Sequence, residues 1–435
     1  METPRDLFQI DRTLRKVLTG LASGTLDAAR LPRELSSKAT FDDLGELRGD
    51  PLADAVRSWV GHLTVLRVTA SDVARAREAR VADDHVSPVS DAPLSFRALA
   101  REVARARPDA ERWIAALAGA SSRARDAIVV HAERRAEATR RLGVQDPGDV
   151  DHPPFRRADV DQAARAVLDA TDAAFAAEVG RGELRRAVEI SLARDAGEGW
   201  PAHLTERWVR SLFRGPLTDG LAIELGELPA ELGAASFARA LASFGAGLAR
   251  ADVGRGAPVA LCRTPGDVLV SSRAALFGGL ALEPAFHRRK LGTDASRARG
   301  ESRRVARAAL LWLRVAAARA LVWRTLGEAT AWSERLSTAS DVVERATGAP
   351  IDRALVGVFP RVSPDDGAVV VGALLALSAR ESLRDAFDED WFDNPRAAEA
   401  LRHEHQATTL ARGYGPRSVE AGIAALARWV GHTYA

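Results

Sequence analysis

Histidines that could hold a metal ion or act as a base are few and scattered along this chain of 435 residues. Of the nine, only His403 and His405 lie close together in sequence, on either side of Glu404. Residues two apart on a helix point to different sides, so both imidazoles could not easily reach one ion. Glu399 shares a face with His403, but two ligands do not complete a zinc site. We interpret this stretch as a solvated helix end.

Two further features carry reactive side chains without the partners that their chemistry requires. The acidic stretch 388–394 (DEDWFDN) lacks the alternating oxygen ligands and the turn glycine of a calcium loop. We interpret it as a capping turn before a helix that begins at Pro395. The single cysteine, Cys262, has no histidine base in view and is expected to be a packed small side chain. One cysteine allows no intrachain disulfide, which fits a reducing compartment.

Signatures of the common catalytic classes are also missing from the sequence. It contains no phosphate-binding GxxxxGK[ST] loop, no GxGxxG after a strand, no GxSxG nucleophile elbow and no HExxH zinc motif. Nothing in it gives a reason to expect a cofactor. With 61 basic and 59 acidic residues the net charge is only +2, which gives no electrostatic case for a dedicated nucleic-acid or membrane-surface binder. Arginine-rich helices such as 131–141 interleave acidic residues and read as solvated faces.

Targeting and membrane-spanning segments are not expected. The first 24 residues carry charges throughout and lack the apolar stretch of a signal peptide. The most apolar run, 367–379, is too short to span a bilayer and predicts a buried core helix. The run 309–323 is interrupted by Arg314 and Arg319. Because only three of the basic residues are lysine, we infer a GC-rich coding bias, and we expect a bacterial cytoplasmic protein.

Helical periodicity dominates the chain and predicts a mainly α fold. Between Asp159, a suitable N-cap, and Gly180, a suitable end, apolar residues recur at three- and four-residue steps. The same pattern predicts helices over 97–117, 122–142, 302–325, 341–347, 368–386, 395–407 and 418–432. Strand signals are few: 220–228 alternates apolar and polar residues, and 257–262 and 267–271 are shorter candidates for a sheet of two or three strands.

Two stretches rich in turn-forming residues are predicted to be linkers, 82–94 and 144–155. The second is the better domain boundary. The chain is therefore divided into an N-terminal helical region, 1–145, and a larger helical region, 146–435, with the small sheet near 220–271.

From about residue 220 onward the order of features resembles the M3-like, oligoendopeptidase-type zinc peptidases. In that family a strand leads to a helix carrying HExGH, and a second helix supplies the glutamate that completes the zinc site. Here 220–228 resembles the strand and 236–250 the first helix, in which 242–246 (ASFGA) stands where HExGH would lie. The stretch 257–282 resembles the family's loop and glutamate helix. The segments 284–291 (PAFHRRKL) and 386–402 (AFDEDWFDNPRAAEALR) resemble the family's closing segments. The resemblance implies a large, helical, cleft-bearing fold of the zincin type.

The resemblance places the zinc-site positions on residues that cannot bind zinc. Ala242 and Ala246 stand in place of the two histidines, and Ser243 in place of the general base. Ser272 stands in place of the third ligand, with Ser271 as the alternative one residue earlier. Methyl groups cannot ligate a metal, and neutral hydroxyls are poor zinc ligands. The family's tyrosine that stabilises the tetrahedral intermediate is unmatched too.

The sequence therefore predicts a catalytically inactive peptidase-like protein, without metal or cofactor, which binds a peptide or protein partner and does not hydrolyse it. Two alternatives stay open: an unrelated helical interaction scaffold with a closed core, and an active hydrolase whose site lies elsewhere, with His287, His403 or His405 as candidates. A persistent cleft at the four substituted positions would favour the first interpretation, and a filled core there would favour the scaffold.

Overall fold

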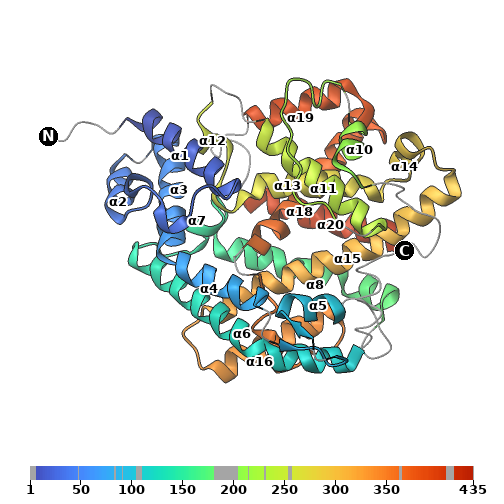
Figure 1. Cartoon of the computed structure of the whole chain (residues 1–435). Coiled ribbons are helices and arrows are strands. Elements are labelled where there is room, and N and C mark those ends of the chain that lie inside the picture. Colours follow the sequence, from blue (N-terminus) through green and yellow to red (C-terminus); the bar gives the residue numbers. More distant parts are fainter. Residues whose placement is uncertain are drawn as a thin grey trace.

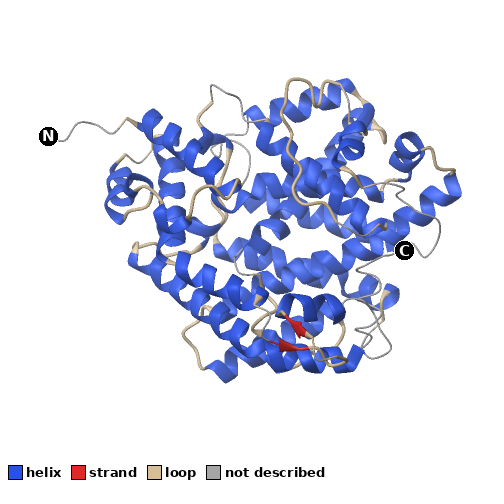
Figure 2. Ribbon diagram, in the orientation of Figure 1, coloured by secondary structure: helices blue, strands red, loops and turns tan. Residues whose placement is uncertain are grey.

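The computed structural model describes residues 6–47, 49–82, 85–90, 92–103, 110–180, 204–213, 215–229, 232–252, 257–361, 365–407 and 416–434. Over this part of the chain the structure is mainly helical, with one small antiparallel sheet (Figure 2). The predicted mainly α fold is confirmed.

The N-terminal helices pack around a shared apolar core, at the left of Figure 1. Carboxylates accept hydrogen bonds from the free amides of a first helical turn, and here Asp6 caps α1 and Asp50 caps α3. The carboxylate of Asp11, buried in α1, accepts hydrogen bonds from the amides of Val259 and Ala260 at 3.0 and 2.8 Å. The later helix α12 is thereby fixed against this group. The helices are α1 (Leu7–Ala22), α2 (Lys38–Glu46), α3 (Pro51–Val68), α4 (Ala70–Val81) and α12 (Val259–Cys262).

A second core joins α4 to long helices at the bottom of Figure 1. A short hairpin precedes it, in which β1 (His85–Val86) pairs antiparallel with β2 (Pro93–Leu94). Besides α4, this core contains α5 (Phe96–Val103), α6 (Ala110–Arg141), α16 (Trp332–Thr347) and α17 (Arg353–Val356). The next helix, α7 (Gly148–Asp151), contributes Val150 to the N-terminal core, and α8 (Arg157–Glu178) packs in a third core with later helices.

Helix α15 (Ala295–Leu326) runs through the middle of the molecule and contacts α6, α8, α11, α14, α16 and α18 (Figure 1). Asp294 caps its first turn through the amides of Ser296 and Arg297. The remaining helices are α10 (Glu206–Ser211), α11 (Ala234–Ala251), α13 (Val268–Gly278), α14 (Pro284–Leu291), α18 (Asp365–Phe387), α19 (Pro395–Ala407) and α20 (Pro416–Tyr434). None of the described helices alone is long and apolar enough to cross a membrane. One bent pair, Val259–Leu282 with Pro284–Leu291, would be long and apolar enough when its two parts are taken together.

The predicted position of the sheet, near 220–271, is wrong. Residues 221–229 are extended, with Ile223 buried and Glu224 exposed as the alternation predicts, but they pair with no other strand in the described part of the chain. They lie along α11 instead, where the Gly226 amide donates to Ser243 Oγ at 2.9 Å. The other two strand candidates contain α12 and the start of α13. Short apolar runs of this kind suit a buried strand and a buried helix equally well.

The two predicted linkers differ from the expectation as well. The first, 82–94, contains the hairpin β1–β2. The second, 144–155, contains α7 and buries Gly148, Val150 and Phe155. A Cβ added at Gly148 would meet the backbone nitrogen of Arg157 at 2.4 Å, so this segment is tightly packed. The division at residue 145 stays a prediction.

Candidate ligand-binding site

The two helices on which the resemblance places the zinc ligands, α11 and α13, pack directly against each other. Glycines allow the approach: a Cβ added at Gly245 would lie 2.4 Å from the carbonyl oxygen of Arg273. One added at Gly278 would lie 3.2 Å from both the Ala238 carbonyl oxygen and the Ala242 Cβ. The predicted neighbourhood of these two helices is therefore observed.

The structure separates the four substituted positions, and Ala246, which is partly buried on α11, does not share a pocket with Ala242. Ala242 faces an open pocket, which we call the apolar pocket, and Ser271 lines the same pocket from α13. Ser243 instead accepts the hydrogen bond from Gly226. Ser272 is buried and does not line this pocket. Gly372 of α18 packs against both serines, since a Cβ added there would meet the Ser271 Cβ and the Ser272 backbone nitrogen, each at 2.7 Å. Ser271, the alternative, is thus the position that shares a pocket wall with Ala242.

One face of each of several helices forms the apolar pocket, which encloses about 310 Å³. Residues three, four and seven apart share a helix face, and the lining residues follow that spacing. From α13 they are Ser271, Ala274, Ala275 and Gly278, together with Leu276, which lies outside that spacing. From α15 they are Val305, Ala309, Trp312 and Leu313. From α18 they are Val369, Ala373, Ala376, Leu377 and Arg380. The volume exists because alanine and glycine stand at many positions where larger side chains would fill it.

Two arginines are the charged side chains of the apolar pocket wall. Arg380 pairs through Nε with the carboxylate of Glu283, which is itself buried. Arg239 is exposed on α11 and stacks on Trp312, with its guanidinium carbon 5.0 Å from the ring centroid. Among the described lining residues there is no Asp, Glu, His or Cys side chain. The pocket can therefore bind apolar groups and oppose a negative charge, but its wall offers Ser271 no base.

The described part of the chain contains no cluster of side chains suited to a metal ion. Within it, no three His, Cys, Asp or Glu residues lie close enough together to hold an ion. The side chains of His403 and His405 lie outside the described residues, although their backbone belongs to α19.

The other candidate residues have structural partners. Cys262 is buried, and burial raises the pKa of its thiol, which disfavours the nucleophilic thiolate. His287 is buried with Nε2 2.7 Å from the Ala281 carbonyl oxygen, and burial lowers its pKa. The acidic stretch ends in a cap, as predicted: α19 begins at Pro395, and the Asn394 side chain accepts the Arg396 amide at 3.0 Å.

A second pocket, of about 100 Å³, lies between α6, α7, α8 and α15, and several charged residues line it. Its charged residues pair with one another: Arg135 with Asp151, and Arg324 with Asp161. Nearby, burial lowers the pKa of His62 to about 4, and its Nδ1 lies 3.2 Å from the Val150 carbonyl oxygen. These groups are consistent with a paired, buried structural cluster.

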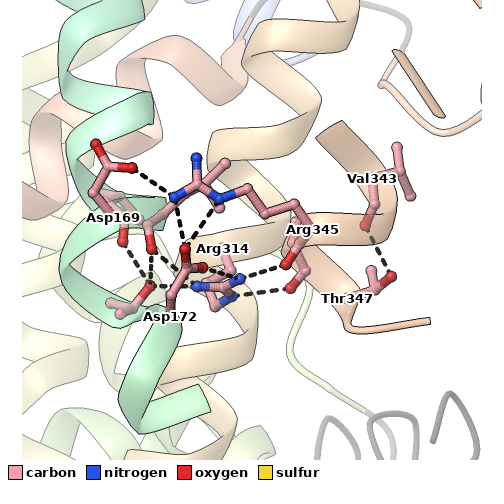
Figure 3. Close-up of polar contacts among 10 residues, drawn as sticks. Asp169, Asp172, Arg314, Val343, Arg345 and Thr347 are labelled. Atoms are coloured by element: carbon pink, nitrogen blue, oxygen red, sulfur yellow. Dashed lines mark hydrogen bonds and ion pairs between the residues drawn. The ribbon is translucent and has the colours of Figure 1, made fainter. Parts of the chain in front are cut away.

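The arginine network around Arg314, on α15, is a feature that sequence reasoning missed (Figure 3). The Arg314 side chain is 1% exposed. Its Nη1 donates to Thr171 Oγ1 at 2.8 Å and to the Leu168 carbonyl oxygen at 3.2 Å. Its Nε donates to the Ala346 carbonyl oxygen at 3.0 Å.

The remaining nitrogen of Arg314, Nη2, donates to the Arg345 carbonyl oxygen and pairs with Asp172 at 2.8 Å. Arg345 in turn pairs with Asp169 and Asp172 (Figure 3). Since a guanidinium has five N–H donors, this one is fully used by the protein. We interpret the network as a structural link between α8, α15 and α16. Its only sequence signal was a charge that interrupts an apolar run.

Comparison of the chain with protein-family models, with curated proteins and with solved structures finds no match. The likeness to M3-like peptidases therefore rests on the residues quoted above and stays a prediction.

Proposed function

We propose that this chain binds a peptide without hydrolysing it, and that the apolar pocket holds an apolar side chain of that peptide. The observation that carries the proposal is the position of the pocket. It is bordered by α11, α13, α15 and α18. Ala242 lines it where the resemblance expects an imidazole, and Ser271 lines it where the alternative alignment expects a carboxylate. Recognition requires pocket walls, whereas hydrolysis also requires a base and an electrophile.

Two features of the geometry favour this function over the alternative scaffold with a closed core. A closed core would fill the space beside Ala242, but about 310 Å³ remains open there. The walls are also held in place, because α11 and α13 touch at Gly245 and Gly278. A preformed apolar pocket of this size is at the lower end of the range for ligand sites, about 300–1,000 Å³, which suits one or two side chains.

The test is incubation of the purified chain with a mixed library of eight-residue peptides, followed by mass spectrometry of the bound and free fractions. We expect a subset with bulky apolar residues to be enriched in the bound fraction and recovered at full length. Ala309→Phe fills the pocket and should abolish the enrichment. The matched control is Ala424→Phe, at an exposed position of α20, which should leave it unchanged.

Cleavage products that accumulate with time would overturn the proposal in favour of an active hydrolase with a displaced site. Absence of any enrichment with a folded wild-type chain would overturn it in favour of the scaffold.

A further inference from the structure

We infer that the apolar pocket recognises the C-terminal end of a peptide, with a bulky apolar last residue in the pocket and its free carboxylate against Arg239 and Arg380. This inference rests on the proposed function and specifies its ligand. Both charged side chains among the described lining residues are cationic, while the rest of the wall is almost entirely apolar. An apolar group that carries one negative charge complements such a surface.

The two arginines, one on α11 and one on α18, lie near the C-terminal end of α13. Ala238, the neighbour of Arg239, packs against Gly278 at the C-terminal end of this helix. Arg380 pairs with Glu283, which follows the 3-10 turn Gly279–Leu282 after that end. Guanidinium groups bind carboxylates through two parallel N–H donors, and the ion pair of Arg380 uses its Nε. Two guanidinium groups therefore lie near one end of the pocket, with the charge of Arg380 balanced by Glu283, while the rest of the wall is almost entirely apolar.

The terminal residue of a peptide fits this arrangement better than an internal segment. Its side chain and its carboxylate leave the same Cα, so one residue reaches both the apolar wall and the arginines without ordering more chain. The volume of about 310 Å³ also suits a single large residue. An internal acidic residue next to an apolar one would have to pass two further chain segments through the same opening.

The test compares two fluorescein-labelled hexapeptides of identical sequence that end in phenylalanine, one with a free carboxylate and one amidated. Fluorescence anisotropy with the full chain measures both affinities. We expect amidation to weaken binding by about tenfold or more, because it removes a charge-assisted contact. A third peptide, with a free carboxylate but a terminal glycine, should bind much more weakly because it leaves the pocket empty.

Variants locate the carboxylate contact. Arg239→Gln should reduce the preference for the acid over the amide, because this side chain is exposed and its replacement leaves the fold intact. Arg380→Lys keeps the charge beside the buried Glu283 while it removes the two-donor geometry, and should also reduce the preference. Arg288→Gln, an exposed arginine of α14 that does not line the pocket, is the matched control and should preserve the preference.

The outcomes separate the two proposals. Equal affinity for the acid and the amide, both lost in Ala309→Phe, would overturn the C-terminal inference while the proposed function stands. Failure of all three peptides, and of the library, would overturn both. A preference that survives in Arg239→Gln and in Arg380→Lys would also overturn the inference, because the carboxylate would then lie elsewhere.

Discussion

Helix α15 lies between two regions that differ in how closely they pack around its side chains. On one face, Ala309 and Trp312 border the apolar pocket, where volume is left open. About 140° round the helix from Ala309 lies Arg314, given 3.6 residues per turn. There the guanidinium is buried between α8 and α16, and all of its donors are used (Figure 3). On the pocket face space is left unfilled, whereas on the other face every N–H donor of the Arg314 guanidinium has an acceptor.

The difference shows how geometry alone can tell a structural polar cluster from a binding site. Burial of a charge is costly unless every group is paired, so a saturated network such as that of Arg314 has little left to offer a ligand. An open apolar pocket has the reverse property, because its walls gain by contact with another molecule. We therefore interpret the charged cluster around Arg314 as structural, and the proposed binding site is the pocket lined by alanines.

Removal of the Arg314 guanidinium should have the largest effect on stability. Arg314→Met removes the guanidinium donors to the carbonyl oxygens of Arg345 and Ala346 at the end of α16, and it breaks the pair with Asp172. We expect a loss of about 3 kcal/mol in the free energy of unfolding, as for other broken buried pairs. Urea unfolding followed by tryptophan fluorescence measures it.

The control for this substitution is Arg345→Met. Arg345 belongs to the same network, but its side chain is 42% exposed, so its ion pairs should contribute about 1 kcal/mol or less. If Arg314→Met were no more destabilising than Arg345→Met, the contrast between the two faces of α15 would fail.

Much of the secondary structure was available from the sequence, for a physical reason. Long amphipathic helices repeat one signal many times, so α8 and α18 were predicted within a few residues of both ends. The prediction for α15 matched its C-terminal end but began at 302, seven residues after its start at Ala295. The 221–229 segment shows the limit. Its alternation correctly predicts that Ile223 is buried, but whether an extended segment pairs with a strand or lies on a helix depends on distant parts of the chain.

The site was only partly predictable. The resemblance to the peptidases implied that α11 and α13 are neighbours, as they are in the structure. It could not choose between Ser271 and Ser272, and a shift of one residue turns a side chain by about 100° on a helix. The pocket itself had no sequence signal beyond abundant alanine. Arg314 was noticed as an interruption of an apolar run. No pattern in the neighbouring residues indicates that its guanidinium would donate to five acceptors.

A larger side chain on α15 should destabilise the protein on one face of the helix and not on the other, by less than the loss of Arg314 does. Ala317 is fully buried in the core with α8, so Ala317→Leu must displace its neighbours. We expect a loss of about 1–3 kcal/mol in the free energy of unfolding. Ala309→Leu, the matched change, points into the apolar pocket and should stay within about 0.5 kcal/mol of the wild type. Both are measured by urea unfolding.

Equal costs for the two leucines would mean that the apolar pocket collapses in solution. A cost confined to Ala317→Leu, together with weaker peptide binding by Ala309→Leu, would support both the open volume and its use.

The smallest expected effect is that of low pH. Acid should destabilise the arginine network and leave the pocket face of α15 unaffected. Burial acts to raise the pKa of Asp172, but hydrogen bonds from Arg345 and Arg314 outweigh it and lower that pKa below the ordinary value of 3.8. The folded state therefore favours the ionised carboxylate. The resulting stability is present above pH 3.8 and is lost as the pH falls toward the pKa of the folded state.

Asp172→Asn removes this contribution. Since the Asp172 side chain is 36% exposed, we expect a cost of about 1 kcal/mol or less at neutral pH. The difference between wild type and Asp172→Asn in urea unfolding should shrink as the pH is lowered below 3.8. Ala309→Leu is the control, because a methyl-to-isobutyl change in a wall without titrating carboxylates should run parallel to the wild type at every pH. If the difference for Asp172→Asn were the same at all pH values, the ionised form of Asp172 would not be what holds α8 to Arg314.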